Sequence, residues 1–161
     1  MAELSRVLWQ QRALIEVLQY RLEVQQLMMV AGRDQRLPMA VEEVELTLAD
    51  IAHVEELRNR VVRDVATELG LRPDATITQI CERAEAPWDF VLGDHQTNLL
   101  LLVTDAEELA TRNRELAHRG LEDSRTLFRQ MNGEVTVSAY GRSGTRTSTL
   151  ALPPSLVDRD A

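Results

Sequence analysis

The sequence predicts an all-α protein: an antiparallel bundle of three long helices with a short connecting helix and a flexible carboxyl-terminal tail. Apolar residues recur at helical spacing over three long stretches. Glycines and prolines, which break helices, cluster between these stretches. Aromatic residues make up only 4% of the 161 residues and charged residues 27%, which is typical of long helices rather than of a β-sandwich.

The first two helices follow from the apolar pattern. Before Gly32, a stripe with helical period predicts a helix of about 28 residues. Between Pro38 and Gly70, a second stripe predicts a helix of similar length that ends at a glycine suited to a left-handed cap. The first stripe includes Leu4, Leu8, Ile15, Leu18, Leu22 and Met29, and the second includes Val44, Leu48, Ile51, Val54, Leu57, Val61, Val65 and Leu69.

A short helix and a third long helix are expected next. Thr76 and Gln79 have the spacing of a capping box, which predicts one or two helical turns after them. Pro87 suits the first turn of a long helix, and the apolar pattern then continues from Trp88 to Leu127. At about 1.5 Å per residue this helix reaches roughly 65 Å, against roughly 45 Å for each of the others. One of its ends should therefore overhang its partners.

Residues 132–161 differ in composition from the helical part of the chain. Three glycines and several Ser and Thr residues stand here, and no helical stripe continues. Alternating apolar residues after Gly133 allow a weak β-hairpin, which is marginal by itself in water. We therefore expect residues 1–131 to form a helical bundle domain and residues 132–161 to form a flexible tail that becomes ordered on a partner.

Charge and composition argue against several classes of partner and compartment. The net charge of −8 has the wrong sign for binding nucleic acid through its phosphates. Cys81 is the single cysteine, so no internal disulfide can form, which fits a reducing compartment. The longest apolar run, Leu99 to Val103, is far shorter than the roughly 20 residues that cross a bilayer. We expect a cytoplasmic protein with no membrane insertion.

The sequence offers little for catalysis. It has no glycine-rich phosphate loop and no nucleophile elbow. An Asp-x-x-His motif ending at His53 and a Glu-x-x-His motif ending at His118 have the spacing of a di-metal site in a bundle, but both histidines should point away from the core stripes. We expect no catalytic residue, metal or cofactor. His95 and Asn113 lie on the stripe itself, where a hydrogen-bonded histidine and a register-fixing asparagine are the structural interpretations.

A long bundle, an apolar overhang and a tail with scattered apolar residues suit a protein that binds another helical protein. The alternative is a self-associating coiled-coil scaffold whose apolar seam pairs with copies of itself. A monomer or weak dimer favours the first interpretation, and a tight oligomer favours the second.

Residues 112–128, in which an Arg112–Asn113 pair precedes spaced leucines, resemble a segment of the FlgN family of flagellar export chaperones. The segment from Tyr140 to Gly144 is similar to that family's Tyr and Gly pattern after the last long helix, and the closing residues 158–161 are similar to its Asp-Arg-x-Ala ending. The order of long helices and the Pro-Trp break at residues 87 and 88 are also similar.

The resemblance implies a cytosolic chaperone that binds hook-associated proteins, which form the hook-filament junction, before their export. It also implies delivery of the complex to the cytosolic face of the flagellar export gate, without nucleotide or metal. In that family the carboxyl-terminal part of the chaperone engages the substrate. Carried onto this sequence, the partner-binding residues are Leu116, Leu121, Leu127, Phe128, Met131, Tyr140, Leu150, Leu152, Leu156 and Val157.

Overall fold

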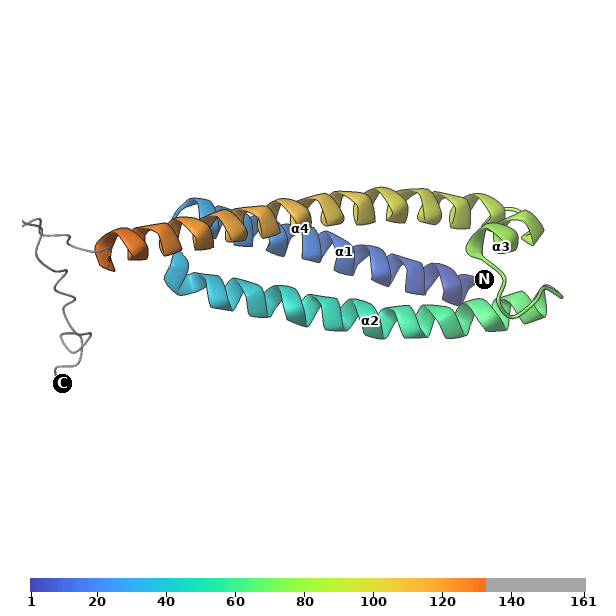
Figure 1. Ribbon diagram of the computed structural model, residues 1–161. Coiled ribbons are helices and arrows are strands. Elements are labelled where there is room, and N and C mark those ends of the chain that lie inside the picture. The colour runs from blue at the N-terminus through green and yellow to red at the C-terminus, as the bar shows by residue number, and fades with distance from the viewer. Residues whose placement is uncertain (133–161) are drawn as a thin grey trace, which may run out of the picture. The chain divides into compact units, whose positions relative to one another are not determined.

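The computed structural model describes residues 1–132, and all regular structure within them is helical (Figure 1). The all-α prediction is therefore confirmed. The predicted hairpin and flexible tail lie outside the described residues, as does nearly all of the predicted second domain. The helices are α1 (Ala2–Val30), the 3-10 helix η1 (Asp34–Arg36), α2 (Leu37–Glu68), α3 (Ile77–Arg83) and α4 (Trp88–Asn132).

Glycines end the first two long helices as the sequence predicts. Gly32 follows α1 with φ of +62° and Gly70 follows α2 with φ of +70°, a left-handed conformation that glycine adopts without a Cβ clash. After α1, the Arg33 amide donates to the Met28 carbonyl at 2.9 Å. This bond closes a Schellman motif, so the last carbonyls of the helix are hydrogen-bonded where the chain turns.

The connection to α4 contains the predicted capping box. The Gln79 amide donates to Thr76 Oγ1 at 3.2 Å, and the Thr76 amide donates to Gln79 Oε1 at 2.9 Å. Two of the amide donors that lack an intrahelical partner at the start of α3 are thus satisfied. Pro87 stands one position before α4 rather than in its first turn, and its carbonyl accepts from the Val91 amide at 3.1 Å. The first-turn placement is therefore wrong by one residue.

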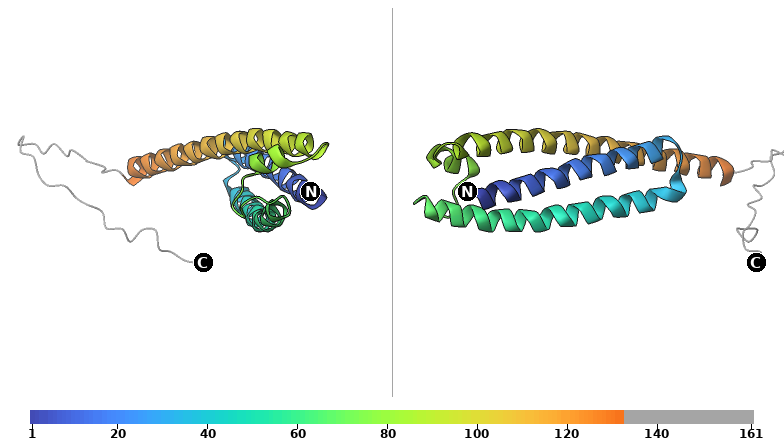
Figure 2. Two further views of the ribbon diagram at one scale, coloured as in Figure 1. Left: turned by 90° about the vertical axis from the view of Figure 1, so that its right-hand side faces the viewer. Right: turned by 180° about the vertical axis from the view of Figure 1, so that it is seen from behind.

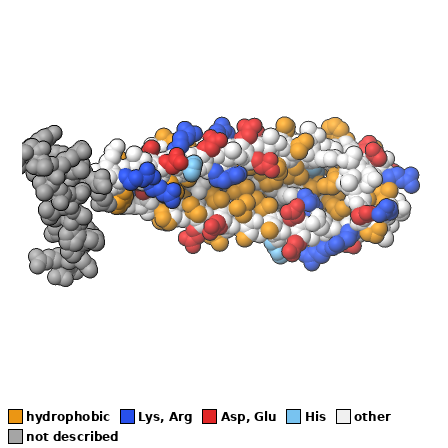
Figure 3. Space-filling model, viewed as in Figure 1, with side chains coloured by type: hydrophobic (Ala, Val, Ile, Leu, Met, Phe, Trp, Pro, Cys, Tyr) orange, Lys and Arg blue, Asp and Glu red, His pale blue; other side chains and the backbone are white. Residues whose placement is uncertain are grey.

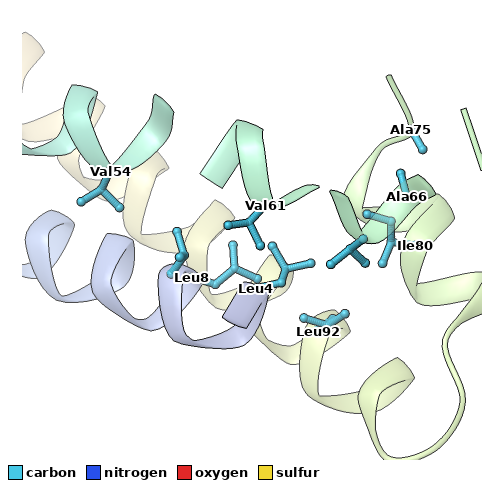
Figure 4. Close-up of a cluster of buried hydrophobic side chains, with 10 residues drawn as sticks. Leu4, Leu8, Val54, Val61, Ala66, Ala75, Ile80 and Leu92 are labelled. Atoms are coloured by element: carbon cyan, nitrogen blue, oxygen red, sulfur yellow. The ribbon is translucent and has the colours of Figure 1, made fainter. Parts of the chain in front are cut away.

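Within Met1–Arg119, the three long helices lie side by side, with α1 and α4 running in one direction and α2 in the other (Figures 1 and 2). At one end of these helices the core joins all four α-helices: Leu4 and Leu8 of α1 meet Val61 of α2, Ile80 of α3 and Leu92 of α4 (Figure 4). Burial of each large side chain contributes roughly 1.5–3 kcal/mol. The apolar stripes therefore form most of the core that the sequence predicts.

Leu48 of the predicted second stripe is an exception: it is 49% exposed, and the neighbouring Thr47 is buried instead. The Thr47 hydroxyl can be buried because it donates to the Glu43 carbonyl at 2.7 Å.

A second core cluster lies further along the same helices. It contains Ile15, Leu18 and Leu22 of α1 together with residues of α2 and α4. Ala106 and Leu109 are the α4 members and Val44 is the α2 member. Both clusters belong to the part of the chain before residue 120.

The chain divides into two compact units, Met1–Arg119 and Gly120–Ala161. The described part of the second unit is the last segment of α4, residues 120–132. Helix α4 has 45 residues, against 29 for α1 and 32 for α2, which confirms the predicted difference in helix length. The domain boundary expected after residue 131 stays a prediction. No helix among residues 1–132 combines the length and the apolar character that a membrane span requires.

Candidate protein-binding surface

Polar side chains of α1 position α4 along the bundle. The Ser5 hydroxyl lies 3.0 Å from Nε2 of His95, and Gln19 Nε2 donates to the Leu102 carbonyl at 2.9 Å. Such bonds are directional, whereas apolar contacts alone permit sliding between two helices. Together with the apolar clusters they hold α4 in one register on α1.

Asn113 makes the last of these contacts along α4. Its Nδ2 donates to the Leu22 carbonyl at 2.8 Å and to Gln25 Oε1 at 2.9 Å, and its side chain is buried. The prediction of a buried seam asparagine is confirmed, and its two bonds to α1 are what fixing a register requires. Its Oδ1 has no partner among the described residues. Beyond Asn113, Leu116 is half-buried, and residues 117–131 are all exposed.

His95 is the most buried titratable side chain on this seam, with 2% of its surface exposed. The Trp9 ring meets the imidazole edge-to-face, with ring centroids 5.1 Å apart. The Arg12 guanidinium lies over the same Trp9 ring, 5.1 Å from its centroid. Burial lowers the pKa of His95, with Arg12 adding to the shift and Asp94 opposing it. The imidazole is therefore neutral at neutral pH, which agrees with the predicted role as a hydrogen-bonded bundle residue.

The other candidate chemical groups do not converge. His53 on α2 and His118 on α4 are both exposed, as the sequence predicts. Among residues 1–132, no group of three or more His, Cys, Asp or Glu side chains is placed to hold a metal ion. Cys81 is half-buried against the first core cluster, and burial raises the pKa of its thiol, which disfavours the reactive thiolate.

The exposed large apolar side chains of the last segment of α4 form the candidate surface. Leu127, Phe128 and Met131 are 58%, 68% and 77% exposed, and Leu121 is half exposed. These are four of the five predicted partner-binding residues that the structure describes, and Leu116 is the fifth. The other predicted partner-binding residues lie outside the described residues: Tyr140, Leu150, Leu152, Leu156 and Val157.

Helical rotation places these four side chains on one face. At about 100° per residue, Leu121, Leu127, Phe128 and Met131 fall within an arc of about 120°. Among the other residues from 120 to 131, only Gly120, which has no side chain, and Ser124, whose side chain is small, fall within this arc. We call this surface, defined by Gly120, Leu121, Ser124, Leu127, Phe128 and Met131, the α4 apolar face.

Exposed apolar side chains also occur in the first unit, and the sequence analysis did not identify them. Leu100 and Leu101 of α4 are both more than half exposed, at 68% and 60%. Figure 3 shows hydrophobic side chains gathered between α2 and α4 on one face. The available signal was the unbroken apolar run from Leu99 to Val103, because a run of five residues covers all sides of a helix and only some can be buried.

An exposed apolar helix face of the kind that α4 presents is typical of surfaces that bind other proteins. A family model described as FlgN protein matches residues 1–148 of the chain. The chain therefore belongs to the FlgN family, which is a family of flagellar export chaperones, and the resemblance seen in the sequence is confirmed. Comparison with curated proteins and with solved structures gave no match.

Proposed function

We propose that this chain is a cytoplasmic chaperone of the flagellar type III export system that binds hook-associated proteins. It keeps these proteins from assembling prematurely and delivers them to the cytosolic face of the export gate. Membership of the FlgN family supports the general role. The exposed α4 apolar face is the single observation that supports the binding step.

The physical reason for such a chaperone lies in its clients. A protein that polymerises through amphipathic helices exposes apolar faces before assembly, and these faces associate with one another in the cytosol unless they are covered. An amphipathic helix covers such a face by laying its own apolar residues against it. The α4 apolar face has the pattern for this contact, with large side chains spaced about one and two turns apart.

The energies available are large enough for specific binding. Full burial of Leu127 and Phe128 against a client helix contributes roughly 1.5–3 kcal/mol for each side chain. Together they account for a factor of about 100 or more in the dissociation constant. Two exposed side chains of this size are therefore a sensible target for testing the surface.

The tail, residues 132–161, is the second part of the proposed binding surface. The family resemblance assigns substrate binding to the carboxyl-terminal region, and the apolar residues there are those a solvated tail does not need. A segment that becomes ordered on its client gives lower affinity per unit area, which favours release at the gate.

Binding of purified hook-associated proteins from the same bacterium tests the proposal. We expect the full chain to bind them with a defined stoichiometry, and the double variant Leu127→Ser/Phe128→Ser to bind at least about 100-fold more weakly. The matched control is Leu100→Ser/Leu101→Ser, which changes two side chains of similar exposure on the same helix. This control should bind like the unmodified chain.

Equal loss in both double variants would show that general apolar exposure, rather than the α4 apolar face, drives the binding. Light scattering addresses the scaffold alternative: a chain that forms a tight oligomer and binds no hook-associated protein contradicts the chaperone proposal.

A further inference from the structure

The two edges of the α4 apolar face carry opposite charges. Taking Leu121 as the reference, Arg125 and Arg129 lie about 40° and 80° further around the helix, next to the edge formed by Leu121 and Phe128. Asp123 lies about 40° beyond Leu127, on the other edge. Glu122 lies about 20° beyond Arg129, further from the apolar face. The residues that directly border the face are therefore basic on one edge and acidic on the other.

The basic edge has no partner in the described structure. None of the ion pairs among residues 1–132 involves Arg125 or Arg129. Attraction to the carboxyl end of the helix accounts for an arginine in the last turn, where Arg129 stands, but not for Arg125 a turn earlier.

The net charge around this segment also differs in sign from that of the whole chain. The whole chain carries a net charge of −8, whereas residues 112–132 contain five arginines and three acidic residues. Basic side chains are thus concentrated beside exposed apolar ones in an otherwise acidic protein. They are Arg112, Arg114, Arg119, Arg125 and Arg129, against Glu115, Glu122 and Asp123.

We propose that the α4 apolar face binds an amphipathic client helix that carries carboxylates along the edge meeting Arg125 and Arg129. This rests on the proposed function and adds the chemistry by which a client helix is selected and oriented. Arginine suits this role, because its guanidinium pairs with a carboxylate through two parallel hydrogen bonds and its aliphatic stem covers apolar surface beside it. The acidic Asp123 edge disfavours the reversed helix, which would bring carboxylates against it.

The charges also argue against a second copy of the chain as the occupant in an antiparallel arrangement. A two-fold axis that relates antiparallel helices places each edge against the same edge of the other copy. Arg125 and Arg129 would then face their own equivalents, and like charges in contact are unfavourable.

Two synthetic helical peptides test the proposal on the full-length chain. Both carry the same leucine-rich apolar face, and one bears Glu and the other Lys at the positions that border one edge. Fluorescence anisotropy should show about fivefold tighter binding of the Glu peptide, and this preference should shrink as salt is added.

Charge reversal provides the internal check. The variant Arg125→Glu/Arg129→Glu should bind the Lys peptide more tightly than the Glu peptide. The control Arg60→Glu/Arg63→Glu makes the same change in net charge at exposed positions of α2 and should keep the original preference. A preference that changes equally in both variants would mean that net charge, rather than the edge, is being sensed, which overturns the proposal.

Failure here and failure of the proposed function give different results. Equal binding of both peptides, lost in Leu127→Ser/Phe128→Ser, would leave the apolar face as a binding surface and overturn only the charge selection. If neither peptide binds although the chain binds hook-associated proteins, the selection is also wrong and the client contacts other residues. Binding of neither the peptides nor hook-associated proteins would contradict the chaperone function itself.

Discussion

Leu92→Ala and Phe128→Ala remove a large apolar side chain from two positions on the same helix that differ in burial. Leu92 is 0% exposed and packs in the first core cluster with Leu4 and Ile80, whereas Phe128 is 68% exposed. Truncating a buried leucine removes its transfer free energy and leaves a cavity, at a cost of about 2–5 kcal/mol. Truncating an exposed side chain changes the free energy of unfolding by less than about 0.5 kcal/mol.

Urea and thermal unfolding of the full chain, followed by circular dichroism, measure this difference. We expect Leu92→Ala to lower the free energy of unfolding by about 3 kcal/mol and the melting temperature by about 10 °C. Phe128→Ala should leave both values within error of the unmodified chain.

The difference in the free energy of unfolding between the two variants tests which side chains belong to the core. A loss of more than about 1.5 kcal/mol in Phe128→Ala would mean that this side chain belongs to a packed core and is not available to a client. A loss below about 1 kcal/mol in Leu92→Ala would refute the assignment of the first core cluster.

Three further predictions concern the bundle itself. Because burial lowers the pKa of His95 in the folded state, the unfolded chain takes up a proton at a higher pH than the folded chain does. The free energy of unfolding should therefore fall as the pH drops below about 6.5. In His95→Gln, the urea midpoint should depend less steeply on pH in this range. Thr76→Ala removes the capping bond to Gln79 and should cost about 1 kcal/mol in urea unfolding, while no loss would contradict the capping role. Gly70→Ala should destabilise the protein by about 1 kcal/mol, because Gly70 has a positive φ that alanine adopts only with strain. Gly93→Ala should stabilise it by about 0.5–1 kcal/mol, because Gly93 lies inside α4 with open space around it. Equal melting temperatures of the two variants would refute this reasoning.

Much of the fold was predictable because its determinants are local. Glycines in the left-handed conformation and a reciprocal capping box set helix ends through bonds between residues a few positions apart. The apolar period likewise reports which face of each helix is buried, so most core residues of α1, α2 and α4 could be listed from the sequence. The buried Thr47, which stands where the pattern predicted Leu48, could not, because a hydroxyl that bonds within its own helix gives no apolar signal.

The pairing of helices is less accessible from the sequence. The contact between Ser5 and His95 joins residues 90 positions apart, and Arg21 of α1 donates to the Glu43 carbonyl of α2 at 2.6 Å. Nothing in the local pattern of either partner indicates which helix it meets, because any polar residue beside a stripe is also compatible with solvent. These contacts follow from the assembled bundle.

The candidate surface was accessible in part. The difference in helix length and the continued apolar pattern predicted the exposure of Leu127, Phe128 and Met131, which the structure confirms. The charged edges beside them could be assigned only once residues 120–132 were known to form one continuous helix, because the angular position of each charged residue follows from that helix. The apolar pattern alone does not give the positions of charged residues. The remaining predicted contacts, from Tyr140 to Val157, stay predictions.

Hydrogen exchange of the amides in residues 120–132, measured with and without a bound hook-associated protein, tests the central claim most directly. Packing of a client helix on the α4 apolar face suppresses local opening of this segment, so the account predicts slower exchange there in the complex. Exchange around Leu100 and Leu101 should change little. Unchanged exchange in residues 120–132, with new protection confined to the first unit, would contradict the proposed binding surface.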